Sequence, residues 1–322
     1  MTSGPVGMGV ISAADIARRR TAPAMARTDS VRLVAVAARA PQSAAAFAGR
    51  FGCEHLPDYA SVLDHPDVEA VYLPLPTGLR AAWIERALRA GKHVLSEKPL
   101  AMSHDSARHL MRLARDRGLV LVENLVFPLH GQHRFVQGLL ADGVIGELRG
   151  FASEFGIPPR PAGDFRHDPG LGGGALFEVG VYPLRAAQLF LGGELRLHGA
   201  TLEYDDHGVD VAGAALLSSA DGVSAQLGFG FRHAYRSGYT LWGSEGVLTL
   251  GRAFTPPESH RPVVRVERQD HVEEITLPAD HQFVNGLELF AQAVRGGKDT
   301  QALTEISLRQ AALVDAIRTG AS

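Results

Sequence analysis

The stretch VGMGVISAADIA, residues 6–17, joins an apolar run to a turn of small residues and then to a helical pattern. Further short apolar runs follow at 31–38, 69–75, 93–96 and 119–122, and helical patterns separate them. One such pattern covers 81–90, and another begins after Ser103 as a helix N-cap and ends at Gly118. Strands that alternate with helices form βαβ units, so the first 123 residues predict a parallel sheet with right-handed crossovers.

The pattern changes from about residue 147. A strand is predicted at 147–157, a helix at 174–191 behind a triple-glycine turn, and a half-buried antiparallel strand at 224–231. Helices near 281–295 and 305–318 close the chain. We therefore predict an α/β protein with an N-terminal doubly wound Rossmann domain over 1–123. An α+β domain with a mainly antiparallel open sheet follows over 124–322.

Composition narrows the class of function. Apolar residues make up 45% of the 322 residues, and 32 Lys and Arg against 35 Asp and Glu leave a formal charge of −3. This balance argues against a nucleic-acid partner and against an anionic membrane surface. No run of 18 apolar residues and no signal-peptide pattern are present, and the lone Cys53 suits a reducing compartment, so we expect a cytoplasmic protein without a membrane span.

The turn after the first strand is the candidate cofactor site. Small residues there allow a pyrophosphate to approach the backbone, and the following helix N-terminus supplies N–H donors. Ser12 and Ala14 stand where glycines are common, so the turn alone also fits a βα connection without a ligand. The second strand ends near Arg39, and no acid lies between Val31 and Arg50. A missing ribose-binding acid together with an arginine favours NADP(H) over NAD(H). The missing acid is the stronger half of this argument, because in a chain with 29 arginines Arg39 also fits a surface position.

Lys98 is the strongest candidate for chemistry. It lies in Ser96-Glu97-Lys98-Pro99-Leu100, directly after the predicted strand at 93–96, and is one of only three lysines in the chain. Ligands of doubly wound sheets bind at the carboxyl ends of strands. A desolvated lysine can act there as an acid or base, which an arginine cannot.

A second cluster follows the triple glycine at 172–174. Glu178 and Tyr182 lie four residues apart and share one face of the predicted helix. A phenol beside an ammonium group can donate a proton to a developing alkoxide. Taken alone, Tyr182 is better explained as a core aromatic residue of an amphipathic helix.

Other polar residues are weaker candidates. Asn124 lies just after the predicted strand at 119–122, and Arg166 and His167 precede the glycine turn. His130 and His133 are spaced i,i+3 without a third ligand in a familiar spacing, so we predict no metal site.

Together these residues resemble the Gfo/Idh/MocA oxidoreductase family over essentially the whole chain. The resemblance rests on the 9–17 turn, Glu97-Lys98-Pro99, and Gly174-Ala175-Leu176-x-Glu178-x-Gly180-x-Tyr182. Within the family the chain looks most like the dTDP-sugar C3-ketoreductases of deoxysugar and antibiotic biosynthesis. That closer resemblance rests on the 14–17, 97–100, 181–183, 231–235 and 267–271 segments.

The resemblance implies NADPH-dependent reduction of the C3 ketone of a dTDP-linked 3,4-diketo-2,6-dideoxyhexose. It implies that Lys98 and Tyr182 are catalytic. The proline of this motif is often cis in the family, so we also expect a cis Lys98–Pro99 peptide. It assigns the cofactor to Gly9, Ser12, Ala13, Ala14, Asp15, Ile16, Arg39, Leu75, Pro76, Glu97, Lys98 and Asn124. It assigns the sugar to Lys98, Arg166, Glu178, Tyr182 and Tyr235. It also implies a homodimer or homotetramer built through the C-terminal sheet.

Three departures from the family pattern stand out. Ser12 replaces a glycine, Glu178 replaces an aspartate that would link to Lys98, and Arg80 stands where histidine is common. The alternatives are an NADP-dependent free-sugar or dihydrodiol dehydrogenase, such as one acting on D-xylose, and a non-catalytic dinucleotide sensor. The sequence leaves open the sugar nucleotide, the product stereochemistry, the role of Arg80, and whether Lys98 or Tyr182 donates the proton.

Overall fold

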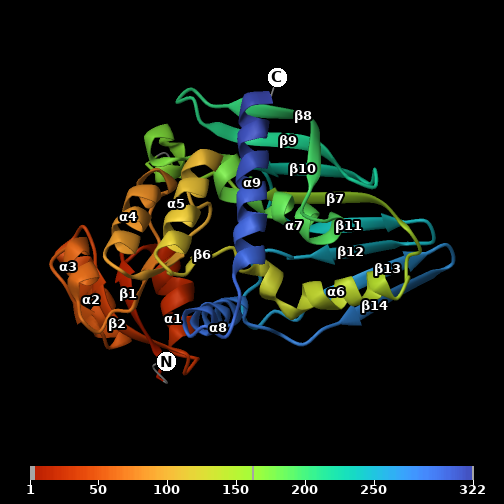
Figure 1. Ribbon diagram of the computed structural model, residues 1–322. Helices are drawn as coiled ribbons and strands as arrows, with labels where there is room; N and C mark the ends of the chain where they lie inside the picture. Colours follow the sequence, from red (N-terminus) through yellow and green to blue (C-terminus); the bar gives the residue numbers. More distant parts are fainter. Residues whose placement is uncertain (1–3, 162, 321–322) are drawn as a thin grey trace. The chain divides into compact units, whose positions relative to one another are not determined.

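The computed structural model describes residues 4–161 and 163–320 and divides them into two compact units (Figure 1). The first unit runs to Val126 and also includes Phe283–Leu308, and the second comprises Phe127–Gln282 and the residues from Arg309 onward. The predicted division at 123/124 places the 283–308 segment in the second domain, whereas the contacts of the chain group it with the first unit.

The first unit contains a six-stranded parallel sheet with the order β3-β2-β1-β4-β5-β6. Its strands are β1 (Val6–Ile11), β2 (Val31–Ala37), β3 (Glu54–His55), β4 (Ala70–Leu73), β5 (His93–Ser96) and β6 (Leu121–Glu123). The five apolar runs therefore form five of the strands, as predicted. The short strand β3 has two exposed polar residues and no apolar pattern that could have revealed it. The strand order reverses at β1 and β4, which is where such sheets bind ligands.

Helices cover both faces of this sheet. They are α1 (Ala22–Met25), α2 (Pro41–Phe51), α3 (Tyr59–Asp64), α4 (Thr77–Arg89), α5 (His104–Asp116) and α8 (Gln282–Val294). Val6, Met8 and Val10 of β1 belong to one core with side chains of α1, α2 and α8. Ser103 caps α5 as predicted, because its hydroxyl accepts a hydrogen bond from the Ser106 N–H.

The second unit contains an eight-stranded sheet with the order β14-β13-β12-β11-β7-β10-β9-β8. Its strands are β7 (Leu148–Gly156), β8 (Leu195–Tyr204), β9 (Asp210–Ser219), β10 (Ser224–Gly230), β11 (Arg236–Gly243), β12 (Val247–Gly251), β13 (Val263–Arg268) and β14 (His271–Thr276). Neighbouring strands are antiparallel except β7 and β10, which run parallel. The prediction of a mainly antiparallel sheet is confirmed, and β10 is antiparallel on one side only.

Helical segments pack on one face of this sheet. Helix α7 (Val181–Leu191) continues directly from a π-helical segment, Leu176–Gly180. A Cβ on Gly180 would lie 3.1 Å from the Phe229 ring of β10, so the glycine allows the helix to approach the sheet closely. The remaining helices are α6 (Gly131–Ala141) and α9 (Gln301–Gly320). Alternate side chains of β9 and β11, including Leu216 and Trp242, are exposed.

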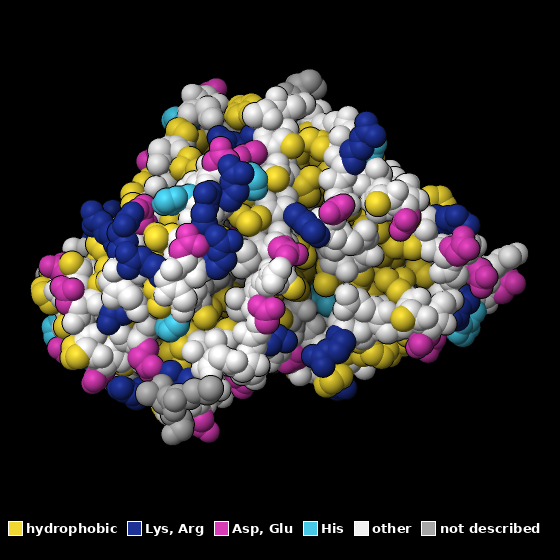
Figure 2. Space-filling view, viewed as in Figure 1, with side chains coloured by type: hydrophobic (Ala, Val, Ile, Leu, Met, Phe, Trp, Pro, Cys, Tyr) yellow, Lys and Arg dark blue, Asp and Glu magenta, His cyan; other side chains and the backbone are white. Residues whose placement is uncertain are grey.

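Side chains of different kinds gather on different elements. Figure 2 shows Lys and Arg side chains gathered over α4 and α5, and hydrophobic side chains among the strands of the second unit. On the two helices Arg89 pairs with Glu85 and Arg108 with Asp105, so acids on the same helices offset part of this basic charge. No described helix is both long enough and apolar enough to cross a membrane.

Candidate active site

The predicted cofactor residues of the first unit follow the carboxyl ends of its parallel strands. Ser12 follows β1, Arg39 follows β2 and Leu75 follows β4. Glu97 and Lys98 follow β5, and Asn124 follows β6. The strands end at one edge of the sheet, so the topology brings together residues that are far apart in sequence.

The turn after β1 starts at Ser12, which has a φ of 97° and donates its N–H to the Ala37 carbonyl at 2.9 Å. The helix that follows contains a π-helical segment, Ala17–Thr21, in which the Ala22 N–H reaches back to the Ala17 carbonyl. Asp15 is exposed and pairs with Arg18 and Arg19. Its carboxylate is thus engaged on the helix surface.

Gly9 lies inside β1 rather than in the turn. A Cβ at this position would lie 2.4 Å from Cγ1 of Val62 on α3. The structure therefore explains this glycine by the close packing of a helix against the sheet.

A buried chain of hydrogen bonds converges on Glu97. The Thr21 hydroxyl donates to the Tyr72 hydroxyl at 3.0 Å, and the Tyr72 hydroxyl donates to Glu97 Oε1 at 2.7 Å. Nδ2 of Asn124 donates to the same carboxylate oxygen at 2.7 Å. Burial, followed by the negative charge of Glu97, raises the pKa of Tyr72 well above its ordinary value, so Tyr72 remains a proton donor to this carboxylate.

Lys98 is buried at the same edge, with 7% of its surface exposed, and the Lys98–Pro99 peptide is cis as the resemblance implies. Arg80 on α4 is also buried and donates to the backbone carbonyls of Leu75 and Pro99. The sequence left Arg80 without a role, and it did not reveal Thr21 or Tyr72. These residues come from separate elements, and no local spacing links them.

The helix that carries Tyr182 starts behind the glycine turn. Gly172 has a φ of 71° and Gly174 a φ of 121°, which glycine adopts readily. A Cβ on Gly174 would lie 2.1 Å from Oδ1 of Asp210, and Oδ2 of Asp210 accepts the Leu176 N–H at 2.6 Å. Burial raises the pKa of Asp210 to about 6. No pattern in the sequence indicates this anchor at the start of β9.

Glu178 and Arg166 are brought together in the second unit, although a turn and a glycine-rich loop separate them in sequence. Nε of Arg166 donates to Glu178 Oε2 at 3.0 Å, and Nη1 of Arg166 donates to Asp164 at 3.0 Å. Both side chains of the Arg166–Glu178 pair are largely shielded from solvent. Two of the predicted sugar-binding residues thus form one charged pair.

Tyr182 is part of an aromatic cluster. Its ring meets Phe155 edge-on at a centroid distance of 5.1 Å and packs against Phe254 at 5.7 Å and Phe127 at 5.9 Å. The Tyr235 ring also contacts Phe155, at a centroid distance of 6.4 Å. The core-aromatic and the site interpretations of Tyr182 are therefore compatible, because its ring packs in the core while the residue stays half-buried.

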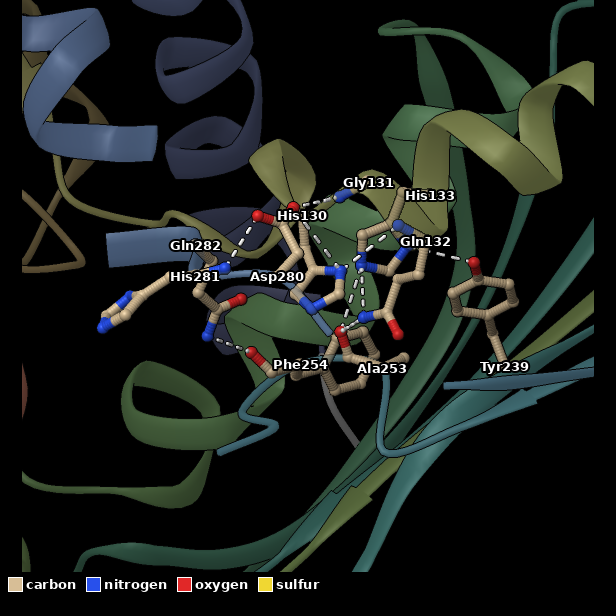
Figure 3. Close-up of polar contacts among 10 residues, drawn as sticks. All are labelled: His130, Gly131, Gln132, His133, Tyr239, Ala253, Phe254, Asp280, His281 and Gln282. Atoms are coloured by element: carbon tan, nitrogen blue, oxygen red, sulfur yellow. Dashed lines mark hydrogen bonds and ion pairs between the residues drawn. The ribbon is translucent and has the colours of Figure 1, made fainter. Parts of the chain in front are cut away.

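His130 and His133 belong to a separate polar cluster of the second unit (Figure 3). The His133 ring contacts the Tyr239 hydroxyl at 3.0 Å and the Ala253 carbonyl at 3.0 Å, and burial lowers its pKa to about 3. Nδ1 of His130 accepts the Gln132 N–H, and Asp280 accepts the Gly131 N–H at 2.7 Å. These contacts give both histidines structural partners within the unit.

Two family models, one for each domain, match this chain. The model "Oxidoreductase family, NAD-binding Rossmann fold" matches residues 6–125, and the model of the GFO/IDH/MocA C-terminal domain matches residues 133–249. The chain belongs to the GFO/IDH/MocA oxidoreductase family. The two matched segments carry the Lys98 edge and the Tyr182 helix respectively.

Individual members of the GFO/IDH/MocA family match the chain along its whole length. The dTDP-3,4-didehydro-2,6-dideoxy-alpha-D-glucose 3-reductase of Actinomadura kijaniata is 51% identical over 98% of this chain and 96% of its own. The enzyme of the same name from Streptomyces antibioticus is 49% identical over 98% of this chain and 97% of its own. The crystal structure of KijD10, a 3-ketoreductase from Actinomadura kijaniata, with NADP and TDP-benzene superimposes with a TM-score of 0.96. It is 51% identical and covers 98% of each chain.

Further crystal structures of this GFO/IDH/MocA relative carry a substitution of one tyrosine or of one lysine. The two substituted positions are separated by the same number of residues as Tyr182 and Lys98 in this chain.

Proposed function

We propose that this protein is an NADPH-dependent ketoreductase that reduces the C3 ketone of a dTDP-linked 3,4-diketo-2,6-dideoxyhexose. The observation that carries the proposal is the buried Lys98 at the carboxyl end of β5, where a parallel sheet binds its ligand. The full-length similarity to 3-reductases of this substrate class supports the choice of sugar. In this proposal residues 1–123 form the dinucleotide-binding domain and residues 124–322 the substrate-binding domain.

The residues of the first unit fit a dinucleotide with a 2′-phosphate. The Oγ1 atom of Thr77, at the N-terminus of α4, is buried and has no hydrogen-bond partner among the described residues. Arg39 is exposed at the end of β2, and no acid lies within 31–50. We assign the pyrophosphate to the backbone and small side chains of residues 12–16, and we include Gly9 of the preceding strand β1 in this cofactor site. We assign the 2′-phosphate to Arg39, and the rest of the cofactor to Leu75, Pro76, Glu97, Lys98 and Asn124.

When bound, NADPH supplies a hydride to the carbonyl carbon of the sugar. In our proposal Lys98 Nζ and Tyr182 Oη act on the carbonyl oxygen, polarise it and supply the proton that completes the alcohol. Arg166, Glu178 and Tyr235 bind the sugar nucleotide together with this pair. The substitutions made at one lysine and one tyrosine of KijD10, at the matching separation, support the choice of these two residues.

The activity test is the oxidation of NADPH in the presence of the dTDP-linked diketo sugar, with identification of the product at C3. We expect turnover with this substrate and none when NADPH is replaced by buffer. Reduction of NADP⁺ by D-xylose or a dihydrodiol, without turnover of the diketo sugar, would instead establish the dehydrogenase alternative. Tight dinucleotide binding without turnover of any of these substrates would indicate a sensor.

The first measurement is a fluorescence titration with NADPH and with NADH. We expect the wild type to prefer NADPH and the Arg39→Glu variant to lose about 10- to 100-fold in NADPH affinity, because a charge-assisted phosphate contact becomes repulsive. Arg32→Glu is the matched control, since Arg32 is an exposed arginine at the amino end of the same strand β2. An equal loss in both variants would contradict a phosphate site at Arg39.

We also propose that a second copy of the chain covers the exposed face of the eight-stranded sheet, as a homodimer or as part of a homotetramer. Exposed apolar side chains at Leu216 and Trp242 favour burial of this face. A hollow on the same face is lined both by small residues such as Ala212 and Gly228 and by larger residues such as Glu154, Tyr235 and Arg236. Sedimentation equilibrium measures the mass of the assembly, and a monomer at all concentrations would contradict this proposal.

A further inference from the structure

The segment Glu97–Leu100 is held by hydrogen bonds on both sides of Lys98. Glu97 accepts from Tyr72 and Asn124, while the Pro99 carbonyl accepts from Arg80. The Leu100 N–H donates to Oε1 of Glu123 at 3.2 Å. Each sequence neighbour of Lys98 is therefore fixed by a side chain from another element of the first unit.

On the Glu97 side, the carboxylate determines the direction of the hydrogen bonds, because it can only accept. The Tyr72 hydroxyl therefore donates to Glu97 Oε1 at 2.7 Å, and its oxygen accepts from the Thr21 hydroxyl at 3.0 Å. Thr21 and Tyr72 are almost completely buried, and Glu97 is 9% exposed. If Glu97 moved away from Tyr72, its carboxylate would lose a hydrogen-bond donor that water could not replace at this buried position. The Tyr72 hydroxyl therefore restrains the position of Glu97.

On the Pro99 side, the guanidinium of Arg80 joins two loops. Nε and Nη2 donate to the Leu75 carbonyl at 3.0 and 2.6 Å, and Nη1 donates to the Pro99 carbonyl. Leu75 follows β4 and Pro99 follows β5, so one planar side chain sets the spacing of the loops at adjacent strand ends. A lysine carries the same charge but lacks the planar fork that makes both contacts.

We propose that Tyr72 and Arg80 are positioning residues of the reduction, which hold the Lys98 ammonium in place through Glu97 and Pro99. This inference rests on the proposed function, in which Lys98 acts on the carbonyl oxygen. It gives Arg80 a role that the sequence left unassigned. It also explains why a tyrosine hydroxyl remote from Lys98 in sequence is buried against a carboxylate.

The test for Tyr72 is a double-mutant cycle with Lys98. We expect Tyr72→Phe to lower kcat about tenfold while the NADPH Kd changes less than about twofold, because displacement of a reacting group affects turnover more than binding. In the Lys98→Ala background the same substitution should have no further effect on single-turnover rate. Tyr239→Phe is the matched control, since Tyr239 is equally buried but its hydroxyl contacts His133 in the second unit.

The test for Arg80 is Arg80→Lys, with Arg295→Lys as the control for loss of an arginine fork in the first unit, where Arg295 pairs with Glu69. We expect a fall in kcat of about 10- to 100-fold for Arg80→Lys and a pH profile of kcat that differs from that of the wild type. Tyr72→Phe is nearly isosteric, so it remains informative if Arg80→Lys does not fold.

Equal losses in the Lys98 and Lys98→Ala backgrounds, or an equal loss in the Tyr239→Phe control, would overturn the inference and leave a purely structural role. Normal turnover in both positioning variants would overturn it too. An inactive wild type with all candidate substrates contradicts the proposed function instead, so the two failures are distinguishable.

Discussion

The two proposed catalytic side chains are held in different ways. Lys98 lies in a short segment restrained by directed hydrogen bonds from Tyr72, Asn124 and Arg80. Tyr182 lies on a helix whose start is fixed by a hydrogen bond to Asp210. The ring of Tyr182 packs among Phe127, Phe155 and Phe254. A π-helical segment occurs in both regions, at Ala17–Thr21 and at Leu176–Gly180.

This contrast shows two physical ways to place a polar group. A charged ammonium in a buried site needs compensating charges and hydrogen bonds, and the region around Lys98 contains the carboxylates of Glu97 and Glu123. A tyrosine can instead be placed largely by packing of its apolar ring, as the contacts of Tyr182 with the three phenylalanines illustrate. The Lys98 region should thus respond to loss of single hydrogen bonds, and the Tyr182 region to changes in packing or in the helix anchor.

The largest effect is expected for Lys98→Ala. We predict a fall in kcat of about 10³-fold with the NADPH Kd changed less than about threefold, because the ammonium acts on the reacting oxygen and is only one of several proposed cofactor contacts. Steady-state kinetics and a fluorescence titration on the same preparation measure both quantities. Lys298→Ala, at an exposed position in the loop between α8 and α9, serves as the control. Turnover close to the wild-type value would rule out Lys98 as a catalytic residue.

A smaller effect is expected for Tyr182→Phe, which retains the ring packing and removes only the hydroxyl. We predict a fall in kcat of about 10- to 100-fold without loss of thermal stability, because the contacts with the three phenylalanines are retained. Tyr204→Phe, at an exposed position of β8, is the matched control. The pH profiles of Lys98→Ala and Tyr182→Phe, compared with the wild type, show which group donates the proton. An unchanged kcat would place Tyr182 in the core only.

The smallest effect is expected at Asp210. Its pKa in the folded protein is about 6, above the ordinary value of 3.8, so between pH 4 and 6 the folded state keeps a proton that the unfolded state has released. The stability contributed by Asp210 therefore falls as the pH rises through this window and is constant above it.

The Asp210→Asn variant lacks this titration. Its unfolding free energy, relative to that of the wild type, should rise by about 1–2 kcal/mol from pH 4 to pH 6. Urea unfolding at several pH values measures the difference, and Asp280→Asn is the control, because Asp280 bonds the Gly131 N–H at the start of α6. A difference that does not depend on pH would contradict the raised pKa of Asp210.

Local patterns in the sequence predicted much of the fold. The apolar runs became β1, β2, β4, β5 and β6, and Ser103 and the triple glycine marked helix starts, because these signals depend on neighbouring residues. The short strand β3 and the parallel pairing of β10 with β7 were missed, because they depend on partners distant in the chain.

The sequence by itself determined the alternation of strands and helices, the family and the identity of the candidate residues Lys98 and Tyr182. Only the tertiary structure showed that Gly9 makes room for α3, that Arg166 pairs with Glu178, and that Thr21, Tyr72 and Arg80 surround the Lys98 segment. The physical reason is that a motif records local backbone and side-chain preferences. Buried hydrogen bonds join residues whose separation in sequence carries no periodic signal, and they exist only once the sheet has brought the strand ends together.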